Sequence, residues 1–234
     1  LRSYFHKDAL QYLELLSGTF FETSVGGSDY RERAEIIDGV MVGIEECRVT
    51  QALYCPARSE TPEEYALHPL GLVYHRGTLY LVAGSPDHVD PKHFKVDRLR
   101  DVSVTQEHFE RPRDFDIQRH LQNSFGVYQK NGSPQAVRVR FAPEAARYVS
   151  EHRWHTSQAF EEQSDGSLIV ELQLNDFTEV TSWILGFGSA AVVLKPESLR
   201  TAIREQAESL VQLYGEKQTQ TSILTRSEHR SQSR

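Results

Sequence analysis

One stretch of the chain, residues 68–98 (HPLGLVYHRGTLYLVAGSPDHVDPKHFKVDR), constrains its fold more than any other. Two short apolar runs rich in β-forming residues, 70–74 and 78–83, are separated only by His75-Arg76-Gly77. Such runs, joined by so short a glycine-bearing connection, predict a β-hairpin. A looser polar segment then returns to residues 94–98. Because aromatic residues, histidines and cations alternate here, we interpret the stretch as a recognition site.

The residues on either side of the hairpin complete a first structural unit. Residues 30–48 place apolar side chains at steps of three or four, which predicts an amphipathic helix. Residues 49–54 and 102–105 alternate between apolar and polar side chains, as strands do. One helix followed by four or five short strands with tight connections predicts a small, strongly bent β-barrel.

The second half of the chain predicts a different fold, beginning at residue 136. The expected elements are a strand at 137–141, a helix opened by Pro143, a hairpin from 159–160 and 168–174, a helix at 177–185, a strand at 190–194 and a last helix opened by Pro196. The order β-α-β-β-α-β-α is a ferredoxin-like split β-α-β with one added helix. The fold class of the whole chain is therefore α+β.

Composition and charge exclude several classes of protein. The net charge of −7 argues against a protein that coats nucleic acid by charge alone. No apolar run approaches the roughly 20 residues that span a bilayer, and no signal peptide is visible. We therefore expect a cytoplasmic protein without membrane association. Two cysteines, Cys47 and Cys55, are too few for a disulfide framework. The chain begins at Leu1 and its only methionine is Met41, so we expect a fragment or a processed product.

Five short motifs stand in a fixed order along the chain. They are Pro69-Leu70-Gly71-Leu72-Val73, Leu79-Tyr80-Leu81-Val82-Ala83, Phe94-Lys95-Val96-Asp97-Arg98, Trp183-Ile184-Leu185-Gly186-Phe187-Gly188 and Ala191-Val192-Val193-Leu194-Lys195-Pro196. The first three resemble the core pattern of WYL-domain proteins, a family of bacterial transcriptional regulators. The last two resemble the usual ending of the family's C-terminal extension, called WCX. The resemblance covers roughly residues 30–215.

The resemblance implies an SH3- or Sm-like β-barrel for a WYL domain at residues 30–112 and a ferredoxin-like fold for a WCX domain at 136–215. Residues 1–29 become a connector helix and linker, residues 113–135 an inter-domain connector, and residues 216–234 a disordered tail. In the family, an N-terminal winged helix-turn-helix binds DNA, and the barrel senses nucleic-acid-like ligands, including single-stranded DNA. This sequence holds no convincing helix-turn-helix. Double-stranded DNA is therefore expected to be bound only through a domain missing from this chain.

Two positions depart from the family pattern. Leu79 replaces the tryptophan that gives the family its name, which removes an aromatic surface at that position. Lys95 replaces the usual arginine and keeps the charge, but it lacks the planar fork that matches phosphate. Arg98 retains that fork.

We predict that five residues bind the effector: Tyr54, His68, Tyr80, Lys95 and Arg98. Cations bind phosphate, and flat aromatic faces stack on bases. If Leu79 and Leu81 face the core, Tyr80 lies on the opposite face and can reach a ligand groove. The alternatives are a half-buried sheet tyrosine for Tyr80 and, for Arg98, a salt bridge to Asp97 or Asp101.

Histidines and charges in the first unit limit the kind of site. Five of the ten histidines lie between residues 50 and 112, but a metal site requires at least three converging ligands and no tight ligand signature is present. We therefore predict neither a metal site nor a cofactor. The same stretch has seven Lys and Arg against nine Asp and Glu, so any basic groove is local. A short anionic ligand suits it better than a long strand.

The sequence thus predicts the sensory portion of a transcriptional regulator. A nucleotide-like or single-stranded nucleic-acid effector binds the WYL barrel, and the WCX unit helps to form a homodimer or transmits the change. The alternative is a non-catalytic dimerisation or interaction module with no small effector. An enzyme is not predicted, because Ser189 lacks the G-x-S-x-G elbow and no specific pattern pairs Cys55 with a histidine.

Overall fold

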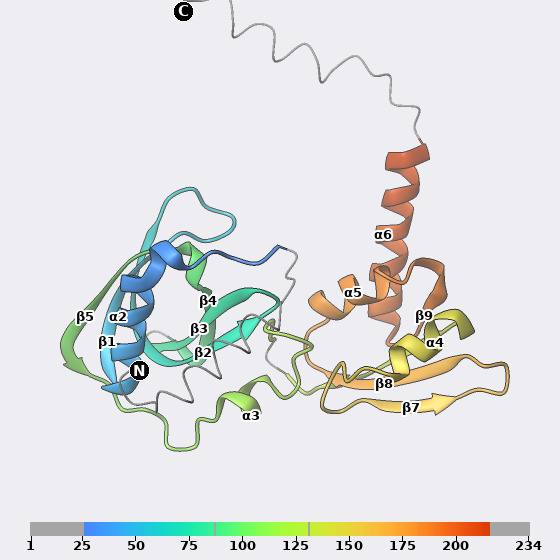
Figure 1. Ribbon diagram of the computed structural model, residues 1–234, viewed down its shortest axis with the longest axis horizontal. Helices are drawn as coiled ribbons and strands as arrows, with labels where there is room; N and C mark the ends of the chain where they lie inside the picture. Colours follow the sequence, from blue (N-terminus) through green and yellow to red (C-terminus); the bar gives the residue numbers. More distant parts are fainter. Residues whose placement is uncertain (1–25, 87, 131, 216–234) are drawn as a thin grey trace, which may run out of the picture. The chain divides into compact units, whose positions relative to one another are not determined.

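The computed structural model describes residues 26–86, 88–130 and 132–215. The chain divides between His120 and Leu121 into two compact units (Figure 1). Most of the predicted N-terminal connector (residues 1–25) and the predicted tail (residues 216–234) lie outside the described residues. Within the described ranges, no helix combines the length and apolar character needed to cross a membrane.

The first unit is a five-stranded antiparallel sheet with one helix packed on it. The strands lie side by side in the order β4-β3-β2-β1-β5. Apolar side chains from the helix and the strands form one core, which includes the fully buried Val40, Leu67, Leu81, Val96 and Leu99. In chain order the elements are η2 (Arg31–Arg33), α2 (Ala34–Glu45), β1 (Arg48–Tyr54), β2 (Glu63–His75), β3 (Thr78–Ser85), β4 (His88–Lys95), η3 (Val96–Arg98), β5 (Leu99–His108) and α3 (Ile117–Leu121).

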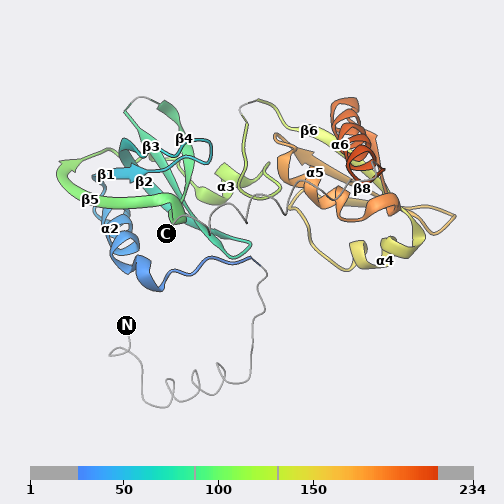
Figure 2. The same ribbon diagram turned by 90° about the horizontal axis from the view of Figure 1, so that it is seen from above.

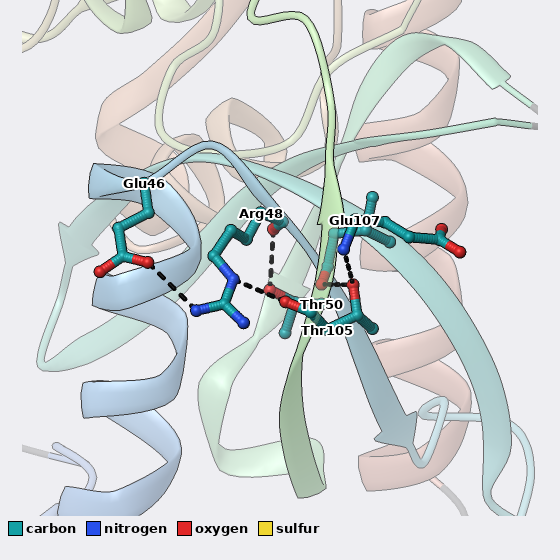
Figure 3. Close-up of polar contacts among 6 residues, drawn as sticks. Glu46, Arg48, Thr50, Thr105 and Glu107 are labelled. Carbon is teal, nitrogen blue, oxygen red and sulfur yellow. Dashed lines mark hydrogen bonds and ion pairs between the residues drawn. The ribbon is translucent and has the colours of Figure 1, made fainter.

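A bulge at the start of β1 sets how α2 meets the sheet. Gly43 lets the helix approach, because a Cβ there would lie 2.5 Å from Oγ1 of Thr50. The register of β1 against β5 shifts between Arg48 and Thr50. There Nε of Arg48 donates to the carbonyl oxygen of Thr105 (2.6 Å), and Oγ1 of Thr105 donates to the carbonyl oxygen of Val49 (2.9 Å; Figure 3). Side chains thus satisfy backbone groups that the bulge removes from the ladder.

The predicted hairpin is confirmed as β2 and β3. His75 pairs with Thr78, which leaves a two-residue loop of Arg76 and Gly77. Both loop residues have positive φ (47° and 76°), as a type I′ turn requires. This turn matches the right-handed twist of the strands and fixes their register.

The segment that follows the hairpin is more regular than the sequence suggested. Instead of a loose return, it forms the strand β4, which pairs antiparallel with β3. Pro91 is tolerated because β4 lies at the edge of the sheet, where one side of the strand needs no partner. The pairing register of β3 with β4 also shifts near this proline, between Ala83 and Ser85 of β3.

The expected closed barrel is not observed. The strands β4 and β5 stand at opposite edges of the hydrogen-bonded order, so the sheet is strongly bent but open. The reason lies in η3, whose three residues turn the chain so that β5 pairs with β1 instead of β4. One bond crosses at this end, from the backbone N–H of Cys55 to the carbonyl oxygen of Arg98 (3.0 Å).

The second unit has the predicted order of elements. Its four strands are antiparallel, in the order β7-β8-β6-β9, and helices cover one face of this sheet (Figure 1). The core between them includes Val139, Phe141, Leu172, Trp183 and Leu199. The elements are β6 (Gln135–Phe141), α4 (Pro143–Ser150), β7 (Ala159–Glu162), β8 (Leu168–Leu174), α5 (Thr178–Leu185), η4 (Gly188–Ala190), β9 (Ala191–Lys195) and α6 (Glu197–Gly215).

A buried carboxylate fastens the loop that leads into this second sheet. Glu179, in the first turn of α5, is only 9% exposed. Its Oε2 accepts the backbone N–H groups of Val127 (2.8 Å) and Tyr128 (3.1 Å). Gly126 is required beside it, because a Cβ there would collide with the carboxylate. Hydrogen bonding thus compensates the cost of burying this charge.

Candidate functional site

The strands β2, β3 and β4 have two chemically different faces, which the pairing register defines. Residues directly opposite each other in neighbouring strands share a face. One row, Leu72, Leu81 and Phe94, packs into the core. The opposite face, called the outer face below, includes two neighbouring rows: Val73, Tyr80 and Lys95, then Gly71, Val82 and His93. Leu79 also packs against the core, so the position of the family tryptophan has a packing role here.

Tyr80 and Lys95 are direct cross-strand partners on the outer face, and both side chains are half-buried. Nζ of Lys95 lies 4.0 Å from the carboxylate of Asp97, at the limit of an ion pair. Burial works to raise the pKa of Asp97, but hydrogen bonds from Ser28 and Tyr30, together with the charge of Lys95, outweigh burial and lower it. Asp97 is therefore ionised at neutral pH.

Tyr30 fixes the segment before α2 to this corner of the sheet. Its Oη accepts the backbone N–H of Leu79 at 2.6 Å and donates to Asp97 at 2.9 Å. The backbone N–H of Ser28 also donates to the carbonyl oxygen of Gly77 in the hairpin turn, at 2.8 Å. The carboxylate nearest to Lys95 is thus held by two other groups, which reduces its capacity to neutralise the lysine.

Arg98 ends η3, three residues beyond Lys95, and is half-buried. Its backbone carbonyl accepts the N–H of Cys55. Within the described parts of the chain, its guanidinium makes no hydrogen bond or ion pair, so neither Asp97 nor Asp101 forms the salt bridge considered from the sequence. A planar cation with five donors therefore stands available for an external anion.

The other two predicted residues lie away from this pair, Tyr54 in the core and His68 on the outer face opposite Gly84. Tyr54 is 8% exposed and faces the core, where its ring meets Phe94 and Tyr65 edge-on at 5.2 and 6.1 Å. His68 stacks parallel on Phe109 with centroids 4.8 Å apart, and burial lowers its pKa. The structure thus brings Tyr80 and Lys95 together, places Tyr54 on the opposite face, and places His68 on the outer face beyond the row of Gly71 and Val82, stacked on Phe109.

A segment that the sequence did not assign to this face covers part of it. Residues 110–120, called the strap below, run from the buried Phe109 through the first four residues of α3. A Cβ on Gly71 would lie 2.8 Å from Cδ1 of Ile117, and Nε2 of His93 lies 2.9 Å from Nε2 of His120. In Figures 1 and 2, α3 lies beside these strands and apart from α2. The strap therefore covers the row of Gly71, Val82 and His93.

Coverage differs between the two rows. Val82 is fully buried, whereas Tyr80 is half-buried and the side chain of Lys95 is 30% exposed. Apolar residues in the predicted connector indicated that the strap packs, but no pattern showed on which face. Among the described residues, no group of three or more His, Cys, Asp or Glu side chains could hold a metal ion. The chemistry of the outer face is that of one aromatic ring and nearby cations.

Family comparisons account for most of the chain. The model of the WYL domain matches residues 35–104, so the first unit is a WYL domain. The model of the WCX domain matches residues 133–211. The chain belongs to the WYL-domain family, in the form that carries a C-terminal WCX domain. A search of curated proteins gave no match.

Solved structures show distant similarity. Proteasome accessory factor B/C (PafBC) of Arthrobacter aurescens is 18% identical over 83% of this chain and 29% of that chain, with a TM-score of 0.35. A CRISPR Cas-related protein is 16% identical over 79% of this chain and 54% of that chain, with a TM-score of 0.54. The chain therefore spans less than a third of the first protein and about half of the second. At this identity the second likeness concerns the fold alone.

Proposed function

We propose that this chain is the effector-sensing portion of a bacterial DNA-binding transcriptional regulator. The effector is nucleotide-like or a short single-stranded nucleic acid, and it binds the outer face of the WYL domain through Tyr80, Lys95 and Arg98. The pairing of WYL and WCX domains supports this class. Contact with double-stranded DNA belongs to a further domain, and the chain itself is not catalytic.

The observation that carries the proposal is the state of the two cations. Arg98 makes no ion pair with any described residue, and Lys95 has only a 4.0 Å contact to a carboxylate already bound by Tyr30. Tyr80 is the direct cross-strand neighbour of Lys95. A phosphate needs charge-assisted donors, and a base needs a flat ring. Lys95 and Arg98 supply the donors, and Tyr80 supplies the ring.

Two features support a short effector. The first unit carries more acidic than basic residues between positions 50 and 112, so the attraction to a polyanion is local. The strap covers the row of Gly71, Val82 and His93 and leaves the row of Tyr80 and Lys95 part-exposed. Both favour a ligand of about one nucleotide over an extended strand.

The proposal is tested by direct binding. Thymidine 5′-monophosphate and short oligothymidylates are titrated into the full chain by calorimetry, alongside the double variant Lys95→Ala/Arg98→Ala. We expect the variant to lose at least about a hundredfold in affinity, because each charge-assisted hydrogen bond contributes roughly 1.5–3 kcal/mol. The matched control Arg76→Ala/Arg100→Ala removes two exposed cations of the same domain and leaves binding unchanged. Equal affinity in both double variants contradicts the site.

A second function rests on a different observation. The distal half of α6 exposes large apolar side chains that no described residue covers: Leu210 (47%), Val211 (71%), Leu213 (62%) and Tyr214 (87%). Such a surface suits a homodimer interface, whether or not an effector binds. Leu210→Glu/Val211→Glu is expected to convert a dimer to a monomer in size-exclusion chromatography with light scattering. A monomeric parent chain contradicts this function.

The fold supports the two domain types named above. An open, bent sheet ordered β4-β3-β2-β1-β5, with a 3₁₀ turn before the last strand, fits an SH3-like unit. The strand order β7-β8-β6-β9 with helices on one face fits a ferredoxin-like unit. Neither fold implies its function, which is why the test concerns the outer face.

A further inference from the structure

The strap meets the outer face at two points that differ from ordinary core packing. Ile117 reaches the strand at a residue without a side chain, Gly71. His120 meets His93 with the rings at 89° and the two Nε2 atoms 2.9 Å apart. Phe115 packs beside His120, with centroids 5.6 Å apart. These contacts cover the row directly next to Tyr80 and Lys95.

The strap is attached firmly at one end. Phe109 is 8% exposed, donates its backbone N–H to Cys47 (2.9 Å) and stacks on His68. Residues 110–114, by contrast, are exposed, and Phe115, Ile117 and His120 are only half-buried. Residues 110–120 are therefore less buried than the anchor at Phe109.

The contact between the two histidines fits a latch. Two neutral imidazoles at this distance share one proton, with one ring as donor and the other as acceptor. If both facing nitrogens carried a proton, two N–H groups would point at each other and the hydrogen bond would be lost. Burial lowers the pKa of His120, the charge of His93 lowers it further, and Asp90 acts in the opposite direction. His120 is therefore neutral at neutral pH, as the shared hydrogen bond requires.

We propose that the strap is a removable cover that sets the length of the effector, with the contact between His93 and His120 as its latch. When the strap is closed, the outer face accepts one nucleotide at Tyr80 and Lys95. When the strap is open, the ring of His93 and the row beside it accept a second base. This inference rests on the proposed function, since it concerns the same face.

The cover also explains why a ligand face carries a buried row. The strap shields Val82 and Gly71. These residues form the row next to that of Tyr80 and Lys95 on the same face. Side chains on one face of a strand repeat every two residues, so Val82 follows Tyr80 and His93 precedes Lys95 on the same face. Opening the strap therefore extends the same groove instead of creating a separate site.

The test compares how affinity depends on the length of the probe. Oligothymidylates of increasing length, with thymidine 5′-monophosphate as the shortest, are titrated into the parent chain and His120→Ala. In the parent chain we expect affinity to level off at the first nucleotide. In His120→Ala we expect the second nucleotide to raise affinity about tenfold, as one stacked base does. His108→Ala removes an exposed histidine at the end of β5 and is the control, with the profile of the parent chain.

Trypsin provides a readout that needs no ligand. Arg113 and Arg119 lie exposed in the strap, and we expect cleavage there to be several-fold faster in His120→Ala than in the parent chain. Cleavage should also accelerate in the parent chain as the pH falls below 6.5. The pKa of His120 is lowered from 6.5 in the closed strap, so the closed strap is most stable above pH 6.5. It loses stability as the pH falls from 6.5 through the lowered pKa.

The outcomes separate the two proposals. If the probes bind in a Lys95-dependent manner but His120→Ala keeps the length profile of the parent chain, the strap does not set effector length and this inference is overturned. If no probe binds either chain, the proposed function fails and the inference fails with it. Equal cleavage in His120→Ala and the parent chain overturns the latch whatever the probes do.

Discussion

Cations of the two units stand in opposite electrostatic settings. On the second sheet, Arg138 pairs with Glu161 (2.6 Å) and Glu171 (3.5 Å), and Arg140 pairs with Asp165. On the first unit, Lys95 has one contact at 4.0 Å, and the guanidinium of Arg98 has no partner among the residues that the structure describes.

The difference indicates which cations serve the fold. Arginines of β6 on the second sheet pair with acidic residues of β8, of β7 and of the turn between them, and so complete the surface of a sheet that needs no ligand. In the first unit, Lys95 and Arg98 differ from Arg48, which pairs with Glu46 at 3.1 Å: Arg98 has no partner among the described residues, and Lys95 only reaches a carboxylate that Tyr30 also binds. A charge left without a counter-ion suits an external anion better than a stable surface. This interpretation predicts that removing charges affects stability in the second unit and binding in the first.

The largest expected effect concerns the buried carboxylate of the second unit. Glu179→Ala leaves the N–H groups of Val127 and Tyr128 without their acceptor, and we expect the free energy of unfolding to fall by about 3 kcal/mol. Both tryptophans of the chain, Trp154 and Trp183, lie in the second unit, so fluorescence during urea unfolding reports on that unit. Glu171→Ala removes a more exposed carboxylate of the same sheet and should cost less than about 1 kcal/mol. Equal losses would refute the distinction.

The next effect tests the corner of the first unit where the hydroxyl of Tyr30 joins the hairpin to Asp97. Tyr30→Phe removes the acceptor of the Leu79 N–H and one donor to Asp97, and we expect a loss of about 1–2 kcal/mol in thermal unfolding followed by circular dichroism. Tyr74→Phe is the matched control, because this tyrosine is 63% exposed in the same hairpin and should change stability by less than about 0.5 kcal/mol. A larger effect at Tyr74 would show that Tyr30 does not hold this corner.

Much of this architecture could be predicted from residue patterns. Alternation in β3 put Leu79 and Leu81 on one face and Tyr80 on the other, and the structure has the leucines against the core. The same alternation in β1 places Tyr54 with the buried Ala52, so its position in the core was readable and was missed. Local periodicity is a reliable guide because side chains alternate along any strand, whatever the strand pairs with.

Features that depend on distant parts of the chain could not be predicted. His93 and His120 are 27 residues apart, and no spacing rule joins a strand to a short helix in a connector. The open sheet is a similar case, because closure depends on whether β4 and β5 pair, and a three-residue turn decides that. Sequence patterns define faces, whereas tertiary contacts define what covers them.

Salt dependence measures how many cations take part in binding at the first unit. For single-stranded nucleic acid, the logarithm of affinity falls with the logarithm of salt concentration by about 0.7 per phosphate contact. Lys95 and Arg98 together therefore predict a slope of about −1.4 for a short oligothymidylate. A much steeper slope would show that further basic residues contact the ligand. A slope near zero would show that Lys95 and Arg98 do not. Calorimetric titrations at several salt concentrations give the value directly.

The smallest expected effect is the most direct comparison of the two sheets. Arg138→Met keeps the aliphatic length of the side chain but removes its pairs to Glu161 and Glu171, and we expect a loss of up to about 1 kcal/mol in urea unfolding. Arg98→Met removes a charge that has no partner among the described residues, so stability should stay the same or rise slightly while binding of thymidine 5′-monophosphate weakens. If Arg98→Met destabilises the chain as much as Arg138→Met and leaves binding intact, Arg98 serves the fold, and the electrostatic contrast between the two sheets does not mark a ligand site.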